Sequence, residues 1–517
     1  MQKRTDLGYE LVAAVDLGSN SFRLQVGRVV GDQVYPLDSL KEVVRLAAGL
    51  KPDRTLDLAS CELALVALRR FGERLRGFAP GAVRAVATNT LRVAKNAPQF
   101  LVQAEAALGF PIEVIAGREE ARLIYIGVAH TLPNPQAQQL IVDIGGGSTE
   151  FIIGRSFKPL ELESLYMGCV SHSLKYFPRG RIDKAGMKEA ELAARKEVQA
   201  IVAAYRKTGW EDAVGSSGTA KAIVDLLEGN GLNRDGQTGI TLEGLDELRS
   251  RLLSAGDVAS LDMIGLRPDR MLVLPGGVAI MSAVFKEFGL KRMAFSDGAL
   301  RLGVIYDLLG RYHHHDQREA TVGQFMRRYE VDRQQAARVK SRALGLLRQL
   351  WPGVEDHPEA LFLDWAARLH EIGISVAHSS YHKHSAYILA NADMPGFSKM
   401  DQERLSRMVL VHRGKLERVQ PLLRDARDLE LIFCLRLAAL LTRARDDAPL
   451  PELRVKANPQ GFQLLVDPHW LAASPLTAAA LAEETRQWAS MGRDFSLSAI
   501  PAAAAPRALQ ASGRTKR

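Results

Sequence analysis

The sequence contains one motif twice, at residues 15–21 (VDLGSNS) and, 127 positions later, at residues 142–148 (VDIGGGS). In each copy an apolar run leads to an aspartate, a turn rich in glycine, serine or asparagine follows, and a second apolar run comes after the turn. This pattern predicts two β-hairpins. Such turn residues adopt positive φ easily and can direct backbone N–H groups toward an anion. Two facing hairpins would form a cleft that binds phosphate from both sides, with Asp16 and Asp143 placed where a metal ion is useful.

The chain is long enough for several domains. Its 517 residues predict three or four domains of about 100–200 residues each. Up to about residue 310 strand-like and helix-like stretches alternate, which is typical of an α/β fold with a mostly parallel or mixed sheet. The expected strands are residues 12–16, 22–29 and 83–88, and the expected helices are residues 58–75, 98–108, 120–129 and 188–207. Strand–turn–helix units are expected at residues 213–224, 272–283 and 294–309.

The pattern changes after about residue 311. The following stretch is rich in Leu, Ala and Arg at helical spacing, and two strand-like runs with a helix come near the end. We therefore expect an α/β lobe at 1–125, a second at 126–310, a helical domain at 311–447, a small α+β element at 448–498 and a disordered tail at 499–517.

The net charge and the cysteine content indicate which partners and which cellular compartment to expect. The net charge of +9 suits a polyanion such as polyphosphate, nucleic acid or an anionic membrane surface, although a basic protein without such a partner is about as common. Three scattered cysteines are too few for a disulfide framework or a zinc site and indicate a reducing compartment. The N-terminus lacks the apolar core of a signal peptide, and the longest apolar stretch, residues 435–441, is too short for a membrane span. We expect a cytoplasmic protein.

The second hairpin carries the strongest single motif, residues 143–150 (DIGGGSTE). Three consecutive glycines cost backbone entropy, so they favour a site where another group approaches the backbone closely. The functional interpretation is a phosphate cradle in which Asp143 and Glu150 hold Mg²⁺ or a water molecule. The alternative is an ordinary glycine-rich hairpin with solvated acids.

Two adjacent acids, Glu119 and Glu120, lie between the hairpins in the sequence. Neighbouring residues cannot share one helix face, so one carboxylate should point into the cleft and the other away. A carboxylate beside a bound polyanion becomes more basic, as a general base requires, while Arg118 and Arg122 would counter this effect and bind phosphate oxygens. The alternative is a solvated first turn of a helix, where the macrodipole favours Glu.

Other glycine- or hydroxyl-rich turns follow strand-like runs. Residues 88–92 (TNTLR) supply hydroxyls, helix N-terminal N–H groups and Arg92 for an anion, although an ordinary helix cap has the same pattern. The other turns are residues 215–219 (GSSGT), which include Gly218 and Thr219, and residues 274–278 (LPGGV). Each is a weak signal alone, but together with the duplicated hairpin they are difficult to attribute to chance.

The helical domain contains several histidines. They are His370 (followed by Glu371), His378, His382, His384 and His412. Histidine with carboxylate on helices could bind Mn²⁺ or Fe²⁺, but no convincing upstream ligand is present. We interpret these histidines as structural or as weak anion contacts, and His313–His315 as a solvated turn between domains.

At this point the sequence resembles the exopolyphosphatase and guanosine pentaphosphate phosphohydrolase family. The resemblance covers nearly the whole chain. With its additional helical domain, the chain is most similar to the long bacterial exopolyphosphatases of this family. The matching segments are residues 14–22, 45–47, 91–92, 119–124, 143–150, 167–171, 218–219, 296–301, 369–373, 382–389 and 411–413.

The resemblance implies processive hydrolysis of terminal phosphate from polyphosphate. It also implies two actin-like lobes of the ribonuclease H-like, sugar kinase, heat-shock and actin superfamily, followed by an all-α degenerate HD-like domain. Glu120 matches the family's catalytic base, Asp143 and Glu150 match its metal- and water-positioning acids, and Asp16 would face them as a further Mg²⁺ ligand. The residues expected to hold phosphate are Ser19, Asn20, Ser21, Arg92, Gly145, Gly146, Gly147, Ser148, Gly218 and Thr219. K⁺ is a candidate activator, a homodimer is expected, nucleic acid is not an expected partner, and any membrane association would be peripheral.

Three alternatives stay open. A guanosine pentaphosphate 5′-phosphohydrolase would use the same site with a different leaving group. An ATP-dependent kinase or chaperone is similar at residues 274–277, but it has no counterpart of residues 119–122 or of the helical domain. A silent polyphosphate- or nucleotide-binding regulator would not need to keep Glu120, Asp143 and Glu150 together.

Overall fold

The computed structural model describes residues 10–30, 33–132, 134, 136–234, 237–312, 317–354, 357–417 and 426–500. The chain forms two compact units. The first comprises Met1–Thr321 together with Asp393–Asp401, and the second comprises Val322–Ala392 and Gln402–Arg517. The expected turn at His313–His315 lies outside the described residues.

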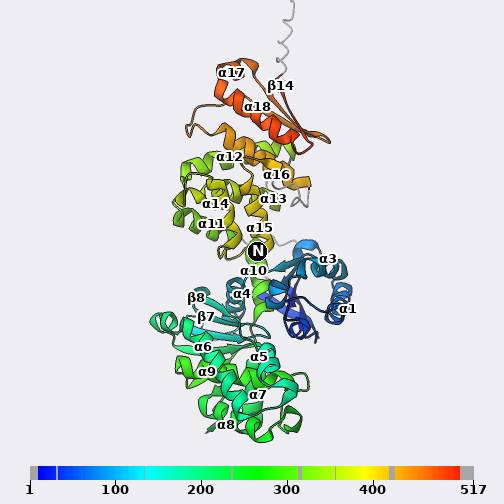
Figure 1. Cartoon of the computed structure of the whole chain (residues 1–517), viewed down its shortest axis with the longest axis vertical. Helices are drawn as coiled ribbons and strands as arrows, with labels where there is room; N and C mark the ends of the chain where they lie inside the picture. Colours follow the sequence, from blue (N-terminus) through cyan, green and yellow to red (C-terminus); the bar gives the residue numbers. More distant parts are fainter. Residues whose placement is uncertain are drawn as a thin grey trace, which may run out of the picture. The chain divides into compact units, whose positions relative to one another are not determined.

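The first lobe is drawn in blue in Figure 1. It contains a five-stranded sheet with the order β3-β2-β1-β4-β5. Its strands are β1 (Leu11–Leu17), β2 (Phe22–Val30), β3 (Gln33–Glu42), β4 (Val83–Ala87) and β5 (Ile112–Val114). The first three strands are antiparallel, whereas β4 and β5 run parallel to β1. Helices α1 (Leu58–Arg74) and α3 (Ala97–Leu108) bury one apolar stripe each, with Phe71 and Phe100 in the shared core.

The second lobe repeats this arrangement. Its sheet has the order β10-β11-β9-β6-β7-β8, with an antiparallel β6-β7-β8 meander and with β9 parallel to β6. The strands are β6 (Gln139–Ile144), β7 (Thr149–Arg155), β8 (Lys158–Leu165), β9 (Asp212–Ser216), β10 (Ile240–Thr241) and β11 (Arg292–Phe295). The helices are α5 (Cys169–Tyr176), α6 (Lys184–Thr208), α7 (Ser217–Gly229), α8 (Leu242–Ala255) and α9 (Leu274–Phe288). The duplicated motif is therefore the β1–β2 hairpin of one lobe and the β6–β7 hairpin of the other, as expected.

Two helices join the lobes. Helices α4 (Gly117–Ala129) and α10 (Leu300–Tyr312) pack against each other, and one buried apolar cluster combines them with residues of both sheets. Their approach is close, because a Cβ on Gly303 would lie 1.7 Å from the carbonyl oxygen of Leu123. The expected lobe boundary at residue 125 falls inside α4, which is a single helix with both faces buried. The boundary predicted from the change of sequence pattern therefore falls inside a helix that packs against both lobes.

The stretch at residues 272–283 is not the expected strand–turn–helix. A short 3₁₀ turn (Met271–Val273) leads directly into α9, whose residues are buried almost throughout. An apolar run without periodicity does not distinguish a buried strand from a buried helix. Among the described residues, one stretch, Met271–Phe288, is apolar and long enough to cross a membrane, and 78% of it is buried inside the protein.

The second unit is helical and ends in a small sheet. Its helices are α11 (Gln317–Arg328, which begins in the first unit), α12 (Arg333–Leu350), α13 (Pro358–Leu369), α14 (Tyr381–Asn391), α15 (Lys399–Leu410) and α16 (Ala426–Leu441). Strands β12 (Arg454–Asn458), β13 (Gly461–Val466) and β14 (Asp494–Ala499) form a sheet in that order, beside α17 (Pro468–Ala473) and α18 (Pro475–Ala489). Phe433 of α16 stacks on Phe462 of β13 with ring centroids 4.1 Å apart, so the sheet and the helices share a core.

The beginning of the expected disordered tail is corrected. Ala499 is the last residue of β14, which runs parallel to β13, and the N–H of Ile500 donates to the carbonyl of Val466. The parallel pairing was not expected, because the helix α18 separates the two strands in the sequence and only local hairpins leave a clear signal. The rest of the expected tail, residues 501–517, lies outside the described residues.

Candidate active site

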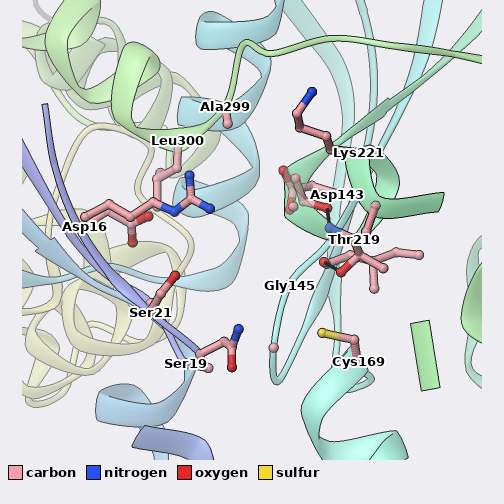
Figure 2. Close-up of a pocket in the computed structure, with 18 of the residues that line it drawn as sticks. Asp16, Ser19, Ser21, Asp143, Gly145, Cys169, Thr219, Lys221, Ala299 and Leu300 are labelled. Carbon is pink, nitrogen blue, oxygen red and sulfur yellow. Dashed lines mark hydrogen bonds between the residues drawn. The ribbon is translucent and has the colours of Figure 1, made fainter. Parts of the chain in front are cut away.

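A pocket of about 390 Å³ lies between the turns of the two hairpins (Figure 2). Asp16 and Ser19 lie on one wall, and Asp143 and Gly145 lie on the opposite wall. Most residues expected at the site line this pocket: Asp16, Ser19, Asn20, Ser21, Glu120, Asp143, Gly145, Gly146, Ser148, Gly218 and Thr219. The expected residues outside its lining are Arg92, Gly147 and Glu150.

The two hairpin turns approach each other at their glycines. A Cβ on Gly147 would lie 2.2 Å from the Asn89 Nδ2 atom, and a Cβ on Gly146 would lie 3.0 Å from the Cβ of Ser19. Thr90 donates a hydrogen bond of 2.8 Å to the Ser19 hydroxyl and thereby fixes the first turn. A side chain at 146 or 147 would therefore press against the first turn or Asn89, and Gly147 faces Asn89 instead of the pocket.

The N-terminus of α5 supports the back of the second turn. The N–H groups of Cys169 and Val170 donate to the carbonyls of Gly145 and Gly146, at 2.9 and 3.0 Å. A Cβ on Gly168 would lie 2.3 Å from the backbone of Gly146. Because the carbonyls of the turn are bonded on this side, its other side is left to line the pocket.

Glu120 is the carboxylate of α4 that faces the pocket. It is buried, and Arg92 Nη1 lies 3.3 Å from its Oε2 while also donating to the carbonyl of Ile115 at 2.9 Å. Burial raises the pKa of Glu120 to about 7, with Arg92 opposing the shift and Asp16 adding to it. Glu119 is buried but is not part of the pocket lining. The prediction that only one of the two acids points into the cleft is confirmed.

Arg118 and Arg122, which were expected to bind phosphate oxygens, do not line the pocket. Arg122 is buried and pairs with Glu119 at 2.8 Å and with Asp307 at 2.6 Å. Arg118 pairs with Glu163 and with Asp393, both at 2.9 Å. Neither arginine lines the pocket, because each is paired with acids outside it.

Three further acids lie at the two hairpins, with Asp16 near the end of β1 and with Asp143 and Glu150 beside the second turn. Burial raises the pKa of Asp16 to about 6 and that of Asp143 to about 6, and it raises the pKa of Glu150 well above its usual value. Asp143 pairs with Glu150 across the β6–β7 hairpin, and Glu150 Oε1 accepts from Ser164 at 2.8 Å behind the pocket. These carboxylates are therefore held in a place where ionisation is unfavourable unless a cation is present.

The donor set fits a magnesium ion that carries few protein ligands. Asp16 Oδ1 is buried without a hydrogen-bond partner, so it has an oxygen available for a cation. Among the described residues no group of three His, Cys, Asp or Glu is arranged to hold a metal by itself. Mg²⁺ is commonly bound through one or two carboxylates and completes its shell with water and substrate phosphate oxygens. Asp16 and Asp143 match that pattern, whereas a closed all-protein cage does not.

Several cations of the pocket were missed by the sequence analysis. They are Arg23, Lys41, Lys221, Arg267, Arg270 and Arg301. Burial and neighbouring arginines lower the pKa values of Arg23 and Arg270. Lys41, Arg267 and Arg270 all lie within 4.0 Å of one acid, Asp269, so their positive charges are incompletely neutralised. A signal existed for Arg23, which pairs with Asp16 in the hairpin register, but Arg267 and Arg270 come from a loop without a motif.

Three histidines of the second unit, His370, His382 and His412, lie close together. The rings of His370 and His412 lie 5.0 Å apart and those of His382 and His412 lie 6.4 Å apart. His370 Nδ1 and His412 Nδ1 bond to the backbone carbonyls of Ala367 and Val409 at 2.7 Å. Among the residues that the structure describes, no group of three His, Cys, Asp or Glu is arranged to hold a metal ion, and the structural role of these histidines stays a prediction.

Family profiles and related proteins match nearly the whole chain. Residues 25–312 match the profile of the Ppx/GppA phosphatase family, and residues 317–485 match Ppx/GppA phosphatase, domain III. A protein of Pseudoalteromonas translucida is 37% identical over 486 residues, which are 93% of this chain and 97% of that protein. A protein of Pseudoalteromonas atlantica is 38% identical over 492 residues, which are 93% and 96% of the two chains. Both are named guanosine-5′-triphosphate,3′-diphosphate pyrophosphatase.

A solved structure is similar to this chain in fold. The crystal structure of an exopolyphosphatase from Cytophaga hutchinsonii superposes with a TM-score of 0.53 at 23% identity and covers 58% of this chain and 98% of that one. This similarity supports the two actin-like lobes expected from the sequence. With a family profile across both units and relatives of nearly full length, the chain belongs to the Ppx/GppA phosphatase family.

Proposed function

We propose that this phosphatase removes the terminal phosphate of a polyphosphorylated substrate, with Glu120 as the general base. The observation that carries the proposal is the environment of Glu120, a buried carboxylate at the pocket wall whose pKa is raised to about 7. A general base is most effective when its pKa lies near the working pH. Glu120 would accept a proton from the water that attacks the terminal phosphorus, and the bond from that phosphorus to the bridging oxygen would break.

The two turns would orient the substrate. Phosphate oxygens would lie against Gly145, Gly146 and Ser148 on one wall and against Ser19 and Asn20 on the other, all of which line the pocket. Phosphoryl transfer needs little covalent chemistry from a protein, so fixed donors and neutralised charge account for most of the rate enhancement. The cations Arg23 and Arg270 would neutralise phosphates that are not being cleaved.

We propose that the resident metal is Mg²⁺, held by Asp16 and Asp143, with Glu150 behind them and bonded to Ser164. A bound Mg²⁺ supplies charge neutralisation for the phosphate oxygens. Asp16 and Asp143 would orient the ion between the two lobes, and their ionised forms would be favoured by it. K⁺ is proposed as an activator.

Guanosine 5′-triphosphate 3′-diphosphate is the first substrate to consider, since both relatives of nearly full length are named for it. Inorganic polyphosphate is the second, and the observation that favours it is the set of incompletely neutralised cations around the pocket, which requires charge but no base recognition. We also propose a cytoplasmic location, supported by three free cysteines, and a homodimer.

The test is phosphate release with Mg²⁺ from guanosine pentaphosphate and from long-chain polyphosphate, side by side, with ATP as a control. Glu120→Gln is the matched variant, because it keeps the size of the side chain and removes the base. Loss of turnover with retained binding would support the assignment. Turnover close to wild type in Glu120→Gln would refute the base, and equal rates on ATP would refute the substrate class.

A further inference from the structure

The segment Asp393–Asp401 belongs to the second unit in sequence but to the first unit in its contacts. We call this segment the strap. It connects α14 to α15, both of which belong mainly to the second unit. Met394, Phe397 and Ser398 of the strap are buried, so it is a packed element and not a loose connection.

The strap is attached to the first turn of α4. The N–H of Gly396 donates to Glu119 Oε2 at 2.9 Å, and Asp393 pairs with Arg118 at 2.9 Å. Thr321 of α11 also donates to the carbonyl of Pro395 at 2.7 Å. The strap therefore contacts the two residues that directly precede Glu120 in the helix.

Glu119 connects the strap to a buried network of charged side chains in the first unit. Its carboxylate also accepts two hydrogen bonds of 2.8 Å from Arg122, and Arg122 donates to Asp307 of α10 at 2.6 Å. Asp307 in turn accepts from Arg84 of β4 at 2.7 Å. All four side chains are buried, so the geometry of the network is strongly determined, because an unpaired charge there is costly.

The opposite side of the same helical turn is fixed by other groups. Arg92 holds Glu120 and the carbonyl of Ile115, and a Cβ on Gly117 would lie 2.6 Å from the Cβ of Ser164. The first turn of α4 is thus held by Arg92 and β8 on the side of Glu120 and by the strap on the side of Glu119. Glu119 and Glu120 are adjacent residues of one helical turn, so we expect a displacement at Glu119 to move the Glu120 carboxylate as well.

We propose that the strap is a positioning element for the general base. Glu119 and Gly396 act through α4 to hold the Glu120 carboxylate at the pocket wall, and turnover therefore depends on a segment supplied by the chain of the second unit. This inference rests on the proposed role of Glu120. A catalytic group must be held closely, since a displacement of about 1 Å can reduce a rate by about a hundredfold.

The test compares two glycines in the full-length chain. Gly396 and Gly353 both have left-handed backbone, with φ of +89° and +81°, and Gly353 lies in the connection between α12 and α13. Proline cannot adopt this conformation and lacks an N–H, so Gly396→Pro removes the donor to Glu119 and Gly353→Pro makes the same change elsewhere. We expect Gly396→Pro to lower kcat about tenfold with KM within about twofold of wild type, and Gly353→Pro to change neither.

A second pair of variants tests the strap with smaller changes. Asp393→Ala and Glu163→Ala each remove one partner of the exposed Arg118, but only Asp393 belongs to the strap. We expect Asp393→Ala to lower kcat about twofold with unchanged melting temperature, and Glu163→Ala to have no effect on kcat. This pair decides the question if Gly396→Pro fails to fold.

The outcomes separate this inference from the proposed function. Unchanged kcat in Gly396→Pro, an equal fall in Gly353→Pro, or equal kcat in the Asp393 and Glu163 variants would overturn the strap as a positioning element. If Glu120→Gln is inactive at the same time, the base assignment stands without the strap. If Glu120→Gln is active, the proposed function fails first.

Discussion

Arg92 and Glu120 form an ion pair at the wall of the pocket, with Arg92 Nη1 3.3 Å from Glu120 Oε2. Arg92 comes from the helix α2 (Asn89–Val93), which follows β4, and Glu120 comes from the first turn of α4, which follows β5. The pair therefore connects the segments that follow two neighbouring parallel strands of the first sheet. Arg92 is not part of the pocket lining. Its effect on the site is to hold Glu120 and to favour its ionised form.

The first prediction follows from the sign of this interaction. Arg92 lowers the pKa of Glu120 against burial, which raises it to about 7. Arg92→Ala removes the stabilising charge, so the pKa of Glu120 rises further and a larger fraction of the base is protonated at neutral pH. We expect the acidic limb of the kcat profile to move upward by about 0.5–1 pH unit.

The measurement is kcat against pH for wild type and Arg92→Ala, with Lys95→Ala as the control. Lys95 is an exposed cation three residues along the chain that does not line the pocket. An acidic limb that stays in place in Arg92→Ala, or moves equally in Lys95→Ala, would contradict the assignment of Glu120 as the titrating base.

The hairpins and the pocket were predictable because their chemistry is local. The motif at residues 15–21 and 142–148 contains the strand, the aspartate and the turn within a few residues, and the register pairs Asp16 with Arg23 and Asp143 with Glu150. Helical spacing also predicted that only one of the adjacent acids Glu119 and Glu120 faces the cleft, and the resemblance implied that this acid is Glu120. In each case the sequence distance between the interacting groups is short.

The cations of the pocket and the strap were not predictable for the opposite reason. Arg270 reaches the pocket from a loop, and Gly396 reaches Glu119 across 277 positions of sequence. Arg118 and Arg122 were expected to bind phosphate because they flank the base, but tertiary partners such as Asp307 and Asp393 determine their direction. Such pairs depend on packing, which composition and periodicity do not encode.

The second prediction concerns Asp16 and Asp143, the acids near the ends of β1 and β6. Asp16 and Asp143 have pKa values of about 6 in the folded protein, above the usual value of 3.8. The stability that they contribute is present at pH values below about 4 and is lost as pH rises through about 6, because the buried carboxylates must then ionise. In metal-free protein, Asp143→Asn should therefore raise the melting temperature at pH 8 and leave it nearly unchanged at pH 4.5.

Addition of Mg²⁺ should reverse this order. The ion would bind the ionised carboxylates, so it should raise the melting temperature of wild type at pH 8 more than at pH 4.5. Asp143→Asn should lose most of that increase. The measurement is the melting temperature with and without Mg²⁺, with EDTA-treated protein as the metal-free reference. An equal rise of the melting temperature in wild type and Asp143→Asn would exclude Asp143 as a ligand.

The third prediction tests the contact between the two hairpin turns. A Cβ at Gly147 would lie 2.2 Å from the side chain of Asn89, whereas a Cβ at Gly168 would lie 2.3 Å from the backbone of Gly146. A side chain can be shortened and a backbone cannot. We therefore expect Gly147→Ala to lose activity by about tenfold or more and to recover part of it in the double variant with Asn89→Ala.

Gly168→Ala should lose activity similarly but gain nothing from Asn89→Ala. Gly345→Ala is the control, because a Cβ there meets nothing within 4 Å in α12. The readout is kcat together with the melting temperature of each variant. Recovery of Gly168→Ala by Asn89→Ala would show that the two glycines serve one steric purpose, contrary to the geometry.

The fourth prediction concerns the buried network behind Glu120. Asp307 accepts from Arg84 at 2.7 Å and from Arg122 at 2.6 Å, and both arginines are almost completely buried. Asp307→Ala leaves two buried guanidinium groups with one acceptor fewer, which typically costs about 3–5 kcal/mol. Asp307→Asn keeps an oxygen for one of the arginines and should cost less. Because α4 and α10 meet at this network, the loss should appear in the unfolding transition of the first unit.

The measurement is chemical denaturation of the full chain, monitored with a probe in the first unit. Asp364→Ala, which removes an acid paired with Lys340 and Arg368 in the second unit, is the control and should leave that transition unchanged. A free energy of unfolding that falls by less than about 1 kcal/mol in Asp307→Ala would mean that the network does not hold α4 against α10, and the rigid link from the strap to the general base would lose its support.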